Sequence, residues 1–325
     1  MPIRLAARAE SWPLRQPFRI SRGVKTTADV VVVEAREGEH VGLGECAPYA
    51  RYGETIDSVL AQIASVAESC PPRAALQEAL SPGAARNAVD CALWDLESKR
   101  TGCSVAALAR LPAPAPLVTA VTISLDTPER MAAAAAEVAA SPLLKVKVDA
   151  VAPLAAVEAV RAAAANARLI VDPNESWSAD QLIALLPALA DLGVALLEQP
   201  VPAHEDGALE GMAAPVPICA DEAAHVTADL ERIAARYQAV NIKLDKTGGL
   251  TEALTMRQRV LDMGLMLMLG CMVSTSLSMA PALLLAHGAD FVDLDGPWWL
   301  TRDREHGMRF REGWIHPPAA GWGAP

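Results

Sequence analysis

Two lysines stand two positions apart in a short apolar segment of the chain. Lys145 and Lys147 alternate with Leu144, Val146 and Val148, and side chains two residues apart lie on the same face of a strand. Two neighbouring ammonium groups repel each other, so this face needs anionic groups nearby or full solvation. The segment is therefore either an exposed amphipathic strand or part of a cleft that contains acidic groups.

Three acidic residues stand at the ends of further apolar segments. Asp172, Glu198 and Asp221 each close such a segment. Carboxylate oxygens are ligands that Mg²⁺ prefers, and the lack of His or Cys among the three disfavours Zn²⁺. Each acid alone could simply cap a following helix. Because all three occur at matching positions in successive segments, we predict that they bind Mg²⁺.

A third lysine, Lys243, also alternates with apolar residues, in the segment Asn241-Ile242-Lys243-Leu244. Ile242 and Leu244 are expected to pack against helices, which points Lys243 and Asn241 the other way. A buried lysine beside other cations has a lowered pKa and can act as a base. A divalent cation that lies between two such lysines suits the removal of a proton next to a substrate carboxylate. The cation stabilises the dianion that forms, and a lysine takes the proton. With one lysine on each side, the reaction is epimerisation or racemisation.

Strand-like and helix-like segments alternate after residue 116, and these elements must position the residues named above. Such an alternation predicts a parallel sheet, and a closed β/α barrel is the natural arrangement of eight strands. An open doubly wound sheet is the alternative, although no Gly-x-Gly-x-x-Gly motif follows a strand. The predicted strands are 118–124, 143–149, 168–174, 195–200, 217–222, 239–244, 265–270 and 291–296.

The first third of the chain predicts a separate, smaller unit. Residues 1–45 resemble strands, with the basic stretch 18–25 as a loop between them, and residues 54–111 have helical spacing. The proline-rich segment 112–116 is a stiff, extended linker and marks a boundary. The tail, 308–325, is expected to return to the first unit.

Composition limits the classes of partner. The chain has 325 residues, 52% of them hydrophobic, and a formal charge of −11. This charge disfavours nucleic acid or an anionic membrane as the main partner, but a locally positive site can still bind a small anion. Six scattered cysteines without a Cys-x-x-Cys motif favour reduced thiols in a cytoplasmic protein. We expect no signal peptide and no membrane span, and a homo-oligomer is compatible with the sequence.

Together, these motifs resemble those of the enolase superfamily, in its muconate-lactonising-enzyme subgroup, and especially the dipeptide epimerases. The likeness covers essentially the whole chain. It implies an α/β fold in which an N-terminal α+β capping domain (1–113, completed by about 303–325) covers a (β/α)7β TIM-like barrel (114–302). The motifs that carry it are Lys145-Val-Lys147, Asp172-Pro-Asn174, Glu198-Gln-Pro, Asp221-Glu222 and Asn241-Ile-Lys243 followed by Gly248-Gly249.

The resemblance also implies an activity and catalytic residues. The reaction would be Mg²⁺-dependent epimerisation of the C-terminal residue of L-Ala-D/L-Glu-type dipeptides through an enediolate, in the salvage of peptidoglycan peptides. Lys147 and Lys243 would exchange the proton, and Lys145 would neutralise the substrate carboxylate. Asp172, Glu198 and Asp221 would bind Mg²⁺, and Asn174 and Glu222 would support these ligands; a helix-capping role for Asn174 is the alternative.

Substrate selection rests on a second group of residues. Asp293-Leu-Asp295 resembles the signature that holds the α-ammonium of a dipeptide, a group that muconates and succinylbenzoate lack. Arg22 resembles a clamp for a glutamate side-chain carboxylate, for which a bidentate guanidinium is well suited. Thr122, Cys271 and Met272 match the remaining substrate contacts.

Two alternatives remain open. One is another reaction of the superfamily, such as muconate-type cycloisomerisation or o-succinylbenzoate synthesis, and the other is a non-catalytic barrel that binds a metal or a peptide. One residue departs from the pattern: Pro173 stands where a small residue such as alanine is expected, and it removes a backbone N–H at a strand end. We expect a small local adjustment and no loss of metal binding.

Overall fold

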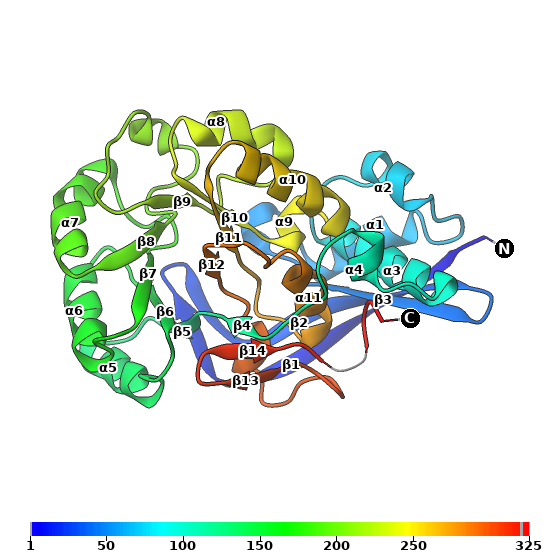
Figure 1. Cartoon of the computed structure of the whole chain (residues 1–325), viewed down its shortest axis with the longest axis horizontal. Helices are drawn as coiled ribbons and strands as arrows, with labels where there is room; N and C mark the ends of the chain where they lie inside the picture. The colour runs from blue at the N-terminus through cyan, green and yellow to red at the C-terminus, as the bar shows by residue number, and fades with distance from the viewer. Residues whose placement is uncertain (1, 319–320, 325) are drawn as a thin grey trace.

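A small α+β unit lies beside a larger unit built around a parallel sheet (Figure 1). The computed structural model of the chain describes residues 2–318 and 321–324. The small unit has one antiparallel sheet, in the order β1 (Arg4–Ile20), β2 (Gly23–Glu37) and β3 (His40–Cys46). Its helices are α1 (Ile56–Ala64), α2 (Arg73–Ala79), α3 (Ala84–Thr101) and α4 (Val105–Leu108).

The large unit contains an eight-stranded sheet in which each strand pairs with its neighbours in the sequence. All of these pairs are parallel, as expected for repeated βα units. The backbone N–H of Ala120 donates to the carbonyl of Val292 at 2.7 Å, so the sheet curls until its two ends meet. The strands are β5 (Val121–Ile123), β6 (Leu143–Lys147), β7 (Arg168–Asp172), β8 (Val194–Glu198), β9 (Ile218–Ala220), β10 (Ala239–Ile242), β11 (Met266–Leu269) and β12 (Phe291–Val292).

Helices connect the strands and cover the outer face of the curled sheet (Figure 1). The side chains of Thr127, Ser178 and Thr275 accept hydrogen bonds from the first turns of three of these helices, which is why they begin there. The last strand of this sheet is followed by a 3₁₀ turn, Gly296–Trp299, in which Pro297 stands in the first turn. The helices are α5 (Pro128–Glu137), α6 (Pro153–Ala163), α7 (Ala179–Asp191), α8 (Leu230–Ala234), α9 (Leu244–Thr247), α10 (Leu250–Asp262) and α11 (Ser276–Leu284).

Strand periodicity separates two apolar layers. Leu144 and Val146 of β6 belong to the core between the sheet and its helices. Leu143 belongs to the core inside the curled sheet. Because Lys145 and Lys147 share the parity of Leu143, their side chains face the interior of the sheet as predicted.

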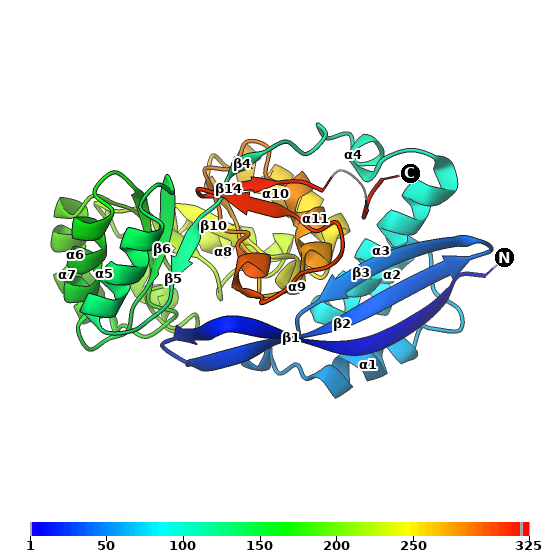
Figure 2. The ribbon, with the colours of Figure 1, turned by 90° about the horizontal axis from the view of Figure 1, so that it is seen from below.

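The hairpin formed by β1 and β2 corrects one expectation, since residues 18–25 are not a loop. Ile20 pairs with Gly23 and Phe18 pairs with Lys25, so only Ser21 and Arg22 form the turn. Phe18 and Ile20 are half-buried on one face, and this strand period outweighs the basic composition of the stretch. Figure 2 shows the hairpin running past the small unit until its tip lies near β5 and β6.

The C-terminal tail contacts both units. The strands β13 (Arg309–Arg311) and β14 (Trp314–His316) form a small sheet with β4 (Leu117–Val118). Beyond them, the indole of Trp322 donates to the carbonyl of Cys91 in α3 at 3.1 Å. Trp322 and Gly323 thus contact the small unit, whereas β14 pairs with β4. Residues 319, 320 and 325 lie outside the described residues.

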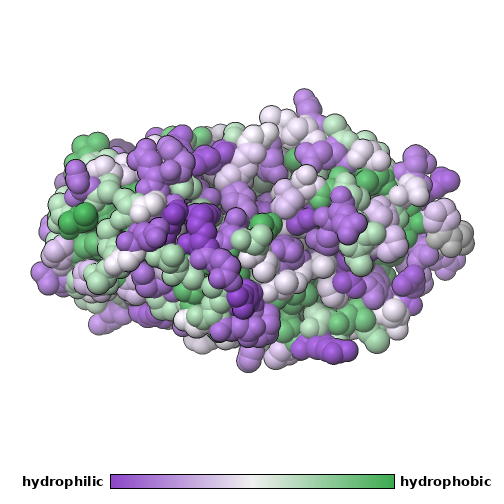
Figure 3. All heavy atoms as spheres, turned by 90° about the horizontal axis from the view of Figure 1, so that it is seen from above, coloured by the Kyte–Doolittle hydropathy of each residue, from purple (hydrophilic) through white to green (hydrophobic). Residues whose placement is uncertain are grey.

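The large exposed apolar side chains of the described residues are few and scattered. On the face shown in Figure 3, hydrophilic residues are interspersed with smaller hydrophobic areas. Among these exposed apolar side chains, Val151 lies before α6, Ile183 lies in α7 and Trp314 lies in β14, a scatter that is ordinary for a folded protein. In the part of the chain that the structure describes, no helix is both long enough and apolar enough to cross a bilayer.

Asp245, in α9, joins the two units through a buried carboxyl group. Its Oδ1 accepts hydrogen bonds from the backbone N–H of Ala47 at 3.1 Å and from Asn87 Nδ2 at 2.8 Å, both in the small unit. Burial outweighs these hydrogen bonds and raises the pKa of Asp245 from 3.8 to about 7.

The replacement Asp245→Asn is expected to change how stability depends on pH. Between about pH 4 and pH 7 the unfolded chain has lost this proton while the folded chain keeps it, so stability falls as the pH rises. Asparagine keeps an oxygen for both hydrogen bonds and does not titrate. The free energy of unfolding of the variant, relative to the parent, should therefore increase by about 3 kcal/mol from pH 5 to pH 8.

Urea unfolding at both pH values measures this difference. The exposed carboxylate of Asp191 provides the control, because Asp191→Asn should show the same difference from the parent at pH 5 and at pH 8. A pH-independent effect of Asp245→Asn would show that the carboxyl group is already ionised at pH 5.

Candidate active site

The side chains with predicted chemistry converge at the C-terminal ends of the parallel strands, which form one rim of the curled sheet. Lys145 and Lys147 are 2% and 6% exposed, so the alternative of an exposed amphipathic strand is wrong. Asp172, Glu198 and Asp221, for which helix capping was the alternative role, are buried as well. The rim residues are Lys145 and Lys147 of β6, Asp172 of β7, Glu198 of β8, Asp221 after β9 and Lys243 after β10.

Lys145 lies between three carboxylates. Its Nζ is 2.6 Å from Glu198 Oε2, 2.9 Å from Asp293 Oδ2 and 3.1 Å from Asp172 Oδ2. These carboxylates come from three different strand ends, and one ammonium group reaches them all. The acids therefore face a common point inside the rim.

The other two lysines stand on opposite sides of this point. Lys147 Nζ is 2.5 Å from Asp172 Oδ2, and Lys243 Nζ is 2.6 Å from Asp221 Oδ2. Three strands lie between β6 and β10 in the sheet, so the two ammonium groups approach the interior from different directions. A substrate carbon held between them would present one face to each lysine.

The pKa of Lys243 is shifted in the direction opposite to the expected one. Burial disfavours its charged form, but the carboxylates of Asp221, Glu198 and Glu222 together outweigh burial and the repulsion of Lys145, and the pKa rises. The pKa of Lys145 is also raised, because Asp293 and Glu198 outweigh burial. The expectation of a lowered pKa considered only neighbouring cations, whereas carboxylates dominate the surroundings of these lysines.

The pKa values of the predicted metal ligands Asp172 and Glu198 are shifted in opposite directions. Burial, followed by the charge of Asp172, raises the pKa of Glu198 to about 7. At Asp172 the ammonium groups of Lys147 and Lys145 outweigh burial and hold the pKa at about 2. Within the described residues, the buried Oε2 of Glu198 has its ion pair to Lys145 but no hydrogen bond.

These observations bear on whether the residues fit a metal ion. Three buried carboxylates lie at neighbouring strand ends, and the charge of Asp172 helps to raise the pKa of Glu198, whose Oε2 accepts no hydrogen bond. They form a donor set suited to a hard divalent cation. Across residues 2–318 and 321–324, however, no three Asp, Glu, His or Cys side chains form a ready cluster for a metal. The ammonium groups of Lys145 and Lys147 lie between the carboxylates instead. The oxygen ligands fit Mg²⁺ in type, and in this structure the ammonium groups balance their charge.

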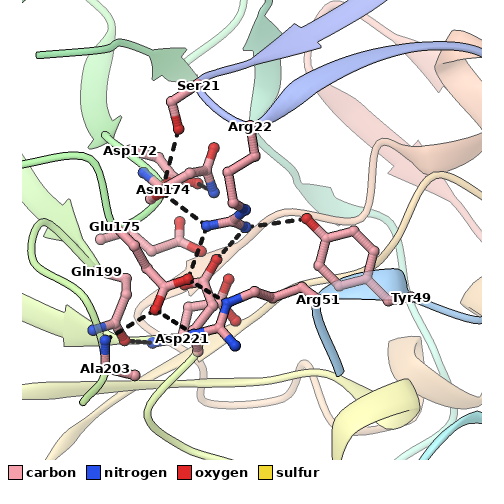
Figure 4. Close-up of polar contacts among 12 residues, drawn as sticks. Ser21, Arg22, Tyr49, Arg51, Asp172, Asn174, Glu175, Gln199, Ala203 and Asp221 are labelled. Carbon is pink, nitrogen blue, oxygen red and sulfur yellow. Dashed lines mark hydrogen bonds and ion pairs between the residues drawn. The ribbon is translucent and has the colours of Figure 1, made fainter. Parts of the chain in front are cut away.

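A buried lysine that the sequence analysis missed holds Asp221. Lys246 is 1% exposed, and its Nζ donates to Asp221 Oδ1 at 2.6 Å and to the carbonyls of Asp221 and Asn241 at 2.5 and 3.0 Å. Gln199 Oε1 accepts from the backbone N–H of Asp221 at 3.0 Å (Figure 4). The spacing of Lys246 from Lys243, about one helical turn, was the available signal.

Asn174 supports Asp172, as one of its two predicted roles required. Its backbone N–H and its Nδ2 donate to the two carboxylate oxygens of Asp172 at 2.9 and 3.2 Å. The capping alternative is wrong, because the side chain of Ser178 caps α7. Pro173 follows the last paired residue of β7, so its missing N–H removes no hydrogen bond between strands.

Arg22 reaches from the tip of the hairpin to the rim of the parallel sheet (Figure 4). Its Nη1 donates to the carbonyl of Asn174 at 2.8 Å and to Glu175 Oε2 at 3.0 Å. Its Nη2 donates to Glu222 Oε1 at 2.5 Å and to the hydroxyl of Tyr49 at 3.0 Å. Both terminal nitrogens of the guanidinium are thus engaged by protein groups, which fasten the hairpin to the rim.

Glu175 is a second residue that the sequence did not reveal. Its carboxylate accepts from Arg51 Nε and Nη2, both at 2.8 Å, and from the backbone N–H of Ala203 at 2.9 Å (Figure 4). It has a left-handed backbone, with φ of 66°. Nothing in its position after Asn174 distinguishes it from an ordinary loop acid, since its partners are distant in the sequence.

A cavity of about 480 Å³ lies between the hairpin, residues 49–52 and the rim. Lys147 and Lys243 both line it, so a molecule in the cavity meets both lysines. The structure also brings all the predicted substrate contacts to this cavity, namely Arg22, Thr122, Lys145, Cys271, Met272, Asp293 and Asp295.

Asp293 and Asp295 form an acidic pair on the cavity wall. Asp293 Oδ2 binds Lys145, but its buried Oδ1 has no hydrogen-bond partner among the described residues. Asp295 Oδ2 accepts from the backbone N–H of Thr122 at 2.8 Å and from Trp299 Nε1 at 3.2 Å. Burial and the charge of Asp293 raise the pKa of Asp295 to about 6. An added cation would relieve the repulsion within this pair.

Opposed lysines above an arc of carboxylates, at the C-terminal rim of a parallel α/β sheet, define the class of proton-transferring α/β enzymes to which enolase-type sites belong. The chain belongs to the mandelate racemase and muconate lactonizing enzyme family of the enolase superfamily. Residues 3–109 match "Mandelate racemase / muconate lactonizing enzyme, N-terminal domain", and residues 130–325 match "Enolase C-terminal domain-like".

Two curated relatives illustrate the range of this family. Over 312 residues the chain is 49% identical to the L-Ala-D/L-Glu epimerase of Escherichia coli (strain K12), covering 94% of this chain and 97% of that protein. It is 43% identical over 293 residues to the N-acetyl-D-glutamate racemase of a Pseudoalteromonas species, with 89% and 93% covered.

Solved structures of similar proteins contain ligands. An enolase family member from Agrobacterium tumefaciens, with homology to dipeptide epimerases, has bound sodium and L-Ala-L-Glu; it is 48% identical, with a TM-score of 0.95 over 97% of this chain and 98% of that one. The dipeptide epimerase of Enterococcus faecalis V583, in complex with Mg and L-Leu-L-Tyr, is 28% identical, with a TM-score of 0.92 over 99% of both chains.

Proposed function

We propose that this protein is a Mg²⁺-dependent dipeptide epimerase that inverts the C-terminal residue of L-Ala-D/L-Glu-type dipeptides. The observation that carries the proposal is the position of Lys147 and Lys243, on opposite sides of one cavity and each paired with its own carboxylate. The similarity to an L-Ala-D/L-Glu epimerase over nearly the full length of both chains supports the choice of substrate.

In this proposal the chain's own residues move one proton. One lysine of the pair, as the free amine, takes the α-proton from the C-terminal residue, and the other lysine, as ammonium, returns a proton to the opposite face. Lys145 holds the substrate carboxylate. Asp172, Glu198 and Asp221 would hold Mg²⁺, with Asn174 and Glu222 supporting them. When bound, the cation would stabilise the enediolate charge and draw carboxylate charge away from the lysines.

The remaining contacts select the substrate. Asp293 and Asp295 are proposed to bind the α-ammonium group, which the unpartnered oxygen of Asp293 favours. Arg22 is proposed to contribute to binding a glutamate side-chain carboxylate. Thr122, Cys271 and Met272 would complete the pocket. Burial and the nearby acids raise the pKa of the half-buried Cys271 thiol, which disfavours a nucleophilic role.

The proposal extends to the architecture. Residues 114–302 would form a closed (β/α)7β TIM-like barrel, which the hydrogen bond between Ala120 and Val292 supports. Residues 1–113, completed by about 303–325, would form the capping domain. The six cysteines, all free thiols, favour a cytoplasmic location. The proposed partner is a small dipeptide from peptidoglycan and not nucleic acid or a membrane; a homo-oligomer is compatible with the proposal.

An exchange experiment tests the proposed reaction. The protein is incubated in D₂O with Mg²⁺ and a small library of L-Ala-X dipeptides, and NMR follows the loss of the α-proton of the second residue. We expect exchange to be fastest for L-Ala-Glu. Exchange on no dipeptide would instead point to another reaction of the superfamily, such as a muconate-type cycloisomerase or an o-succinylbenzoate synthase.

A second candidate, racemisation of N-acetylglutamate, is suggested by one relative. An N-acetyl group carries no ammonium charge, so the acidic pair of Asp293 and Asp295 would have no cation to bind. The pair therefore favours the dipeptide.

The replacement Asp295→Asn separates these candidates. We expect it to lower kcat/KM for L-Ala-L-Glu by roughly 10- to 100-fold, because a charge-assisted hydrogen bond to the ammonium is weakened. Asparagine keeps an oxygen for the N–H of Thr122 and Trp299. N-acetyl-L-glutamate is the matched control substrate, and any turnover of it should be unaffected. An equal loss for both substrates would contradict the ammonium-binding role.

A further inference from the structure

We propose that Gln199 is a positioning residue, which holds the three proposed Mg²⁺ ligands at their relative positions without contacting the cation. This inference rests on the proposed function and gives a role to a residue to which neither the motifs nor the comparisons assign one. Gln199 directly follows Glu198, the last residue of β8, and is fully buried. It does not line the cavity, and its partner Tyr237 belongs to the core between the sheet and its helices. Gln199 therefore reaches the rim from the helix side.

The side-chain amide of Gln199 uses all of its capacity for hydrogen bonds. Its Oε1 accepts from the backbone N–H groups of Asp221 and Ala223, both at 3.0 Å (Figure 4). Its Nε2 donates to the carbonyl of Val201 at 3.0 Å and to the hydroxyl of Tyr237 at 2.9 Å. An amide offers two donor hydrogens and an oxygen with two lone pairs. The group is thus fully engaged in holding the chain after β9 against the chain after β8.

The main chain of Gln199 connects the same neighbourhood to a third strand end. Its carbonyl accepts from the N–H of Glu175 at 2.9 Å, in the segment that follows Asp172 and β7. Its own N–H donates to the carbonyl of Cys219 in β9 at 2.9 Å. One residue is thus bonded covalently to Glu198 and by hydrogen bonds to the segments next to the other two proposed ligands.

A buried group outside the cavity orients the amide. The hydroxyl of Tyr237 donates to Asp206 Oδ2 at 3.1 Å, and two arginines hold that carboxylate. Burial and the charge of Asp206 raise the pKa of Tyr237, so the hydroxyl keeps its proton. Because this proton points to Asp206, the phenolic oxygen presents a lone pair to Nε2 of Gln199. The amide oxygen then faces the N–H of Asp221.

The backbone of Gln199 shows that its surroundings determine its conformation. Its φ is 34°, in the left-handed region that a residue with a side chain seldom adopts and keeps only where its contacts require it. Without the amide, the backbone of Asp221 would lose its fixed place relative to Glu198, while Lys246 would still hold the Asp221 carboxylate. All three acids would remain, but their spacing would no longer be set.

Calorimetric titration of Mg²⁺ into the full chain tests this inference. Gln199→Met keeps the length of the side chain and removes its hydrogen bonds, and it should weaken Mg²⁺ binding by roughly 10- to 100-fold, as is typical for groups that support metal ligands. Tyr237→Phe keeps the ring and removes one hydrogen bond of the amide. It should weaken Mg²⁺ binding by about fivefold, the equivalent of one neutral hydrogen bond.

The chain offers a matched control of the same residue type. Gln238 Oε1 also accepts from a backbone N–H of β9, that of Ile218 at 3.0 Å, but at the opposite end of the strand. Gln238→Met should therefore leave the Mg²⁺ affinity unchanged. Asp206→Asn keeps an oxygen for the hydroxyl of Tyr237 and should also bind Mg²⁺ with about the affinity of the parent.

Urea unfolding of the same variants without Mg²⁺ separates positioning from stability. Weaker Mg²⁺ binding by folded Gln199→Met, with Gln238→Met unchanged, supports the inference. An unchanged affinity overturns it even if the protein is an active epimerase, because Gln199 would then only stabilise the fold. If Gln199→Met does not fold, Tyr237→Phe decides by the same criterion. A parent that binds Mg²⁺ but exchanges no α-proton would refute the proposed reaction, while the variants would still decide the role of Gln199.

Discussion

Replacing Lys147 or Lys243 with alanine is expected to abolish α-deuterium exchange from one epimer of the substrate far more than from the other. Lys147 lies in β6 and Lys243 follows β10, and three strands lie between β6 and β10 in the sheet. Each should therefore reach only one face of the α-carbon. Loss of a positioned general base lowers the rate by about 10²- to 10⁴-fold, so the affected epimer should lose exchange by roughly this factor.

The remaining lysine should stay in place in each variant. Lys147 is held by Asp172 and Lys243 by Asp221, two separate carboxylates, so removing one ammonium leaves the other ion pair intact. The residual exchange then reports the action of a single base. The two variants should therefore show opposite selectivity between the epimers and not merely reduced activity.

The measurement uses L-Ala-L-Glu and L-Ala-D-Glu separately in D₂O, with NMR detection of the α-proton of glutamate. Lys99→Ala is the control, because Lys99 lies in α3 and pairs with Asp95, away from the rim. Equal residual exchange from both epimers in both variants would rule out two opposed bases.

The replacement Asp221→Asn is expected to cost about 3–5 kcal/mol in the free energy of unfolding and to remove stabilisation by Mg²⁺. Asp221 is the carboxylate partner of two buried ammonium groups, those of Lys243 and Lys246. Removing its charge leaves both groups in a low-dielectric interior without this partner. It also removes one of the three proposed cation ligands.

Asp206 offers a matched control for this experiment. It too is a buried carboxylate paired with two cations, Arg232 at 2.9 Å and Arg236 at 2.5 Å, but it does not line the cavity. Because both arginines are partly exposed, Asp206→Asn should lose less stability than Asp221→Asn, and it should still be stabilised by Mg²⁺. For the parent, Mg²⁺ at 100 times its Kd should add about 2.7 kcal/mol.

Urea unfolding with and without Mg²⁺ measures both effects in the parent and the two variants. If Asp221→Asn gained as much stability from Mg²⁺ as the parent, Asp221 would not be a ligand of the cation. If the parent gained none, the proposed metal dependence would be wrong.

The parts of the site that depend on strand period could be predicted from the sequence. The alternation of Lys145 and Lys147 with Leu144 and Val146 is a local property, and it determines which side chains face the interior of the sheet. Parallel strands bring their C-terminal ends to one rim, which placed the acids together. These two rules needed no knowledge of distant contacts.

The parts that depend on contacts between distant segments could not be predicted. Glu175 meets Arg22 and Arg51, which lie more than a hundred residues away, and nothing local marks such a partner. The sign of the pKa shift of Lys243 depends on the number of carboxylates around it, which only the assembled rim determines. The basic composition of residues 18–25 favours a loop, whereas the alternation of Phe18 and Ile20 favours the strand that the structure contains.

The short helix α9 and the residue before it contact both units of the protein. Within four consecutive residues, Lys243 contacts Asp221, Asp245 accepts hydrogen bonds from the small unit, and Lys246 returns to Asp221. These residues are too close in the chain to move independently. A shift of the small unit away from the rim would therefore have to break the hydrogen bonds that Asp245 accepts from Ala47 and Asn87, or displace the segment that carries Lys243.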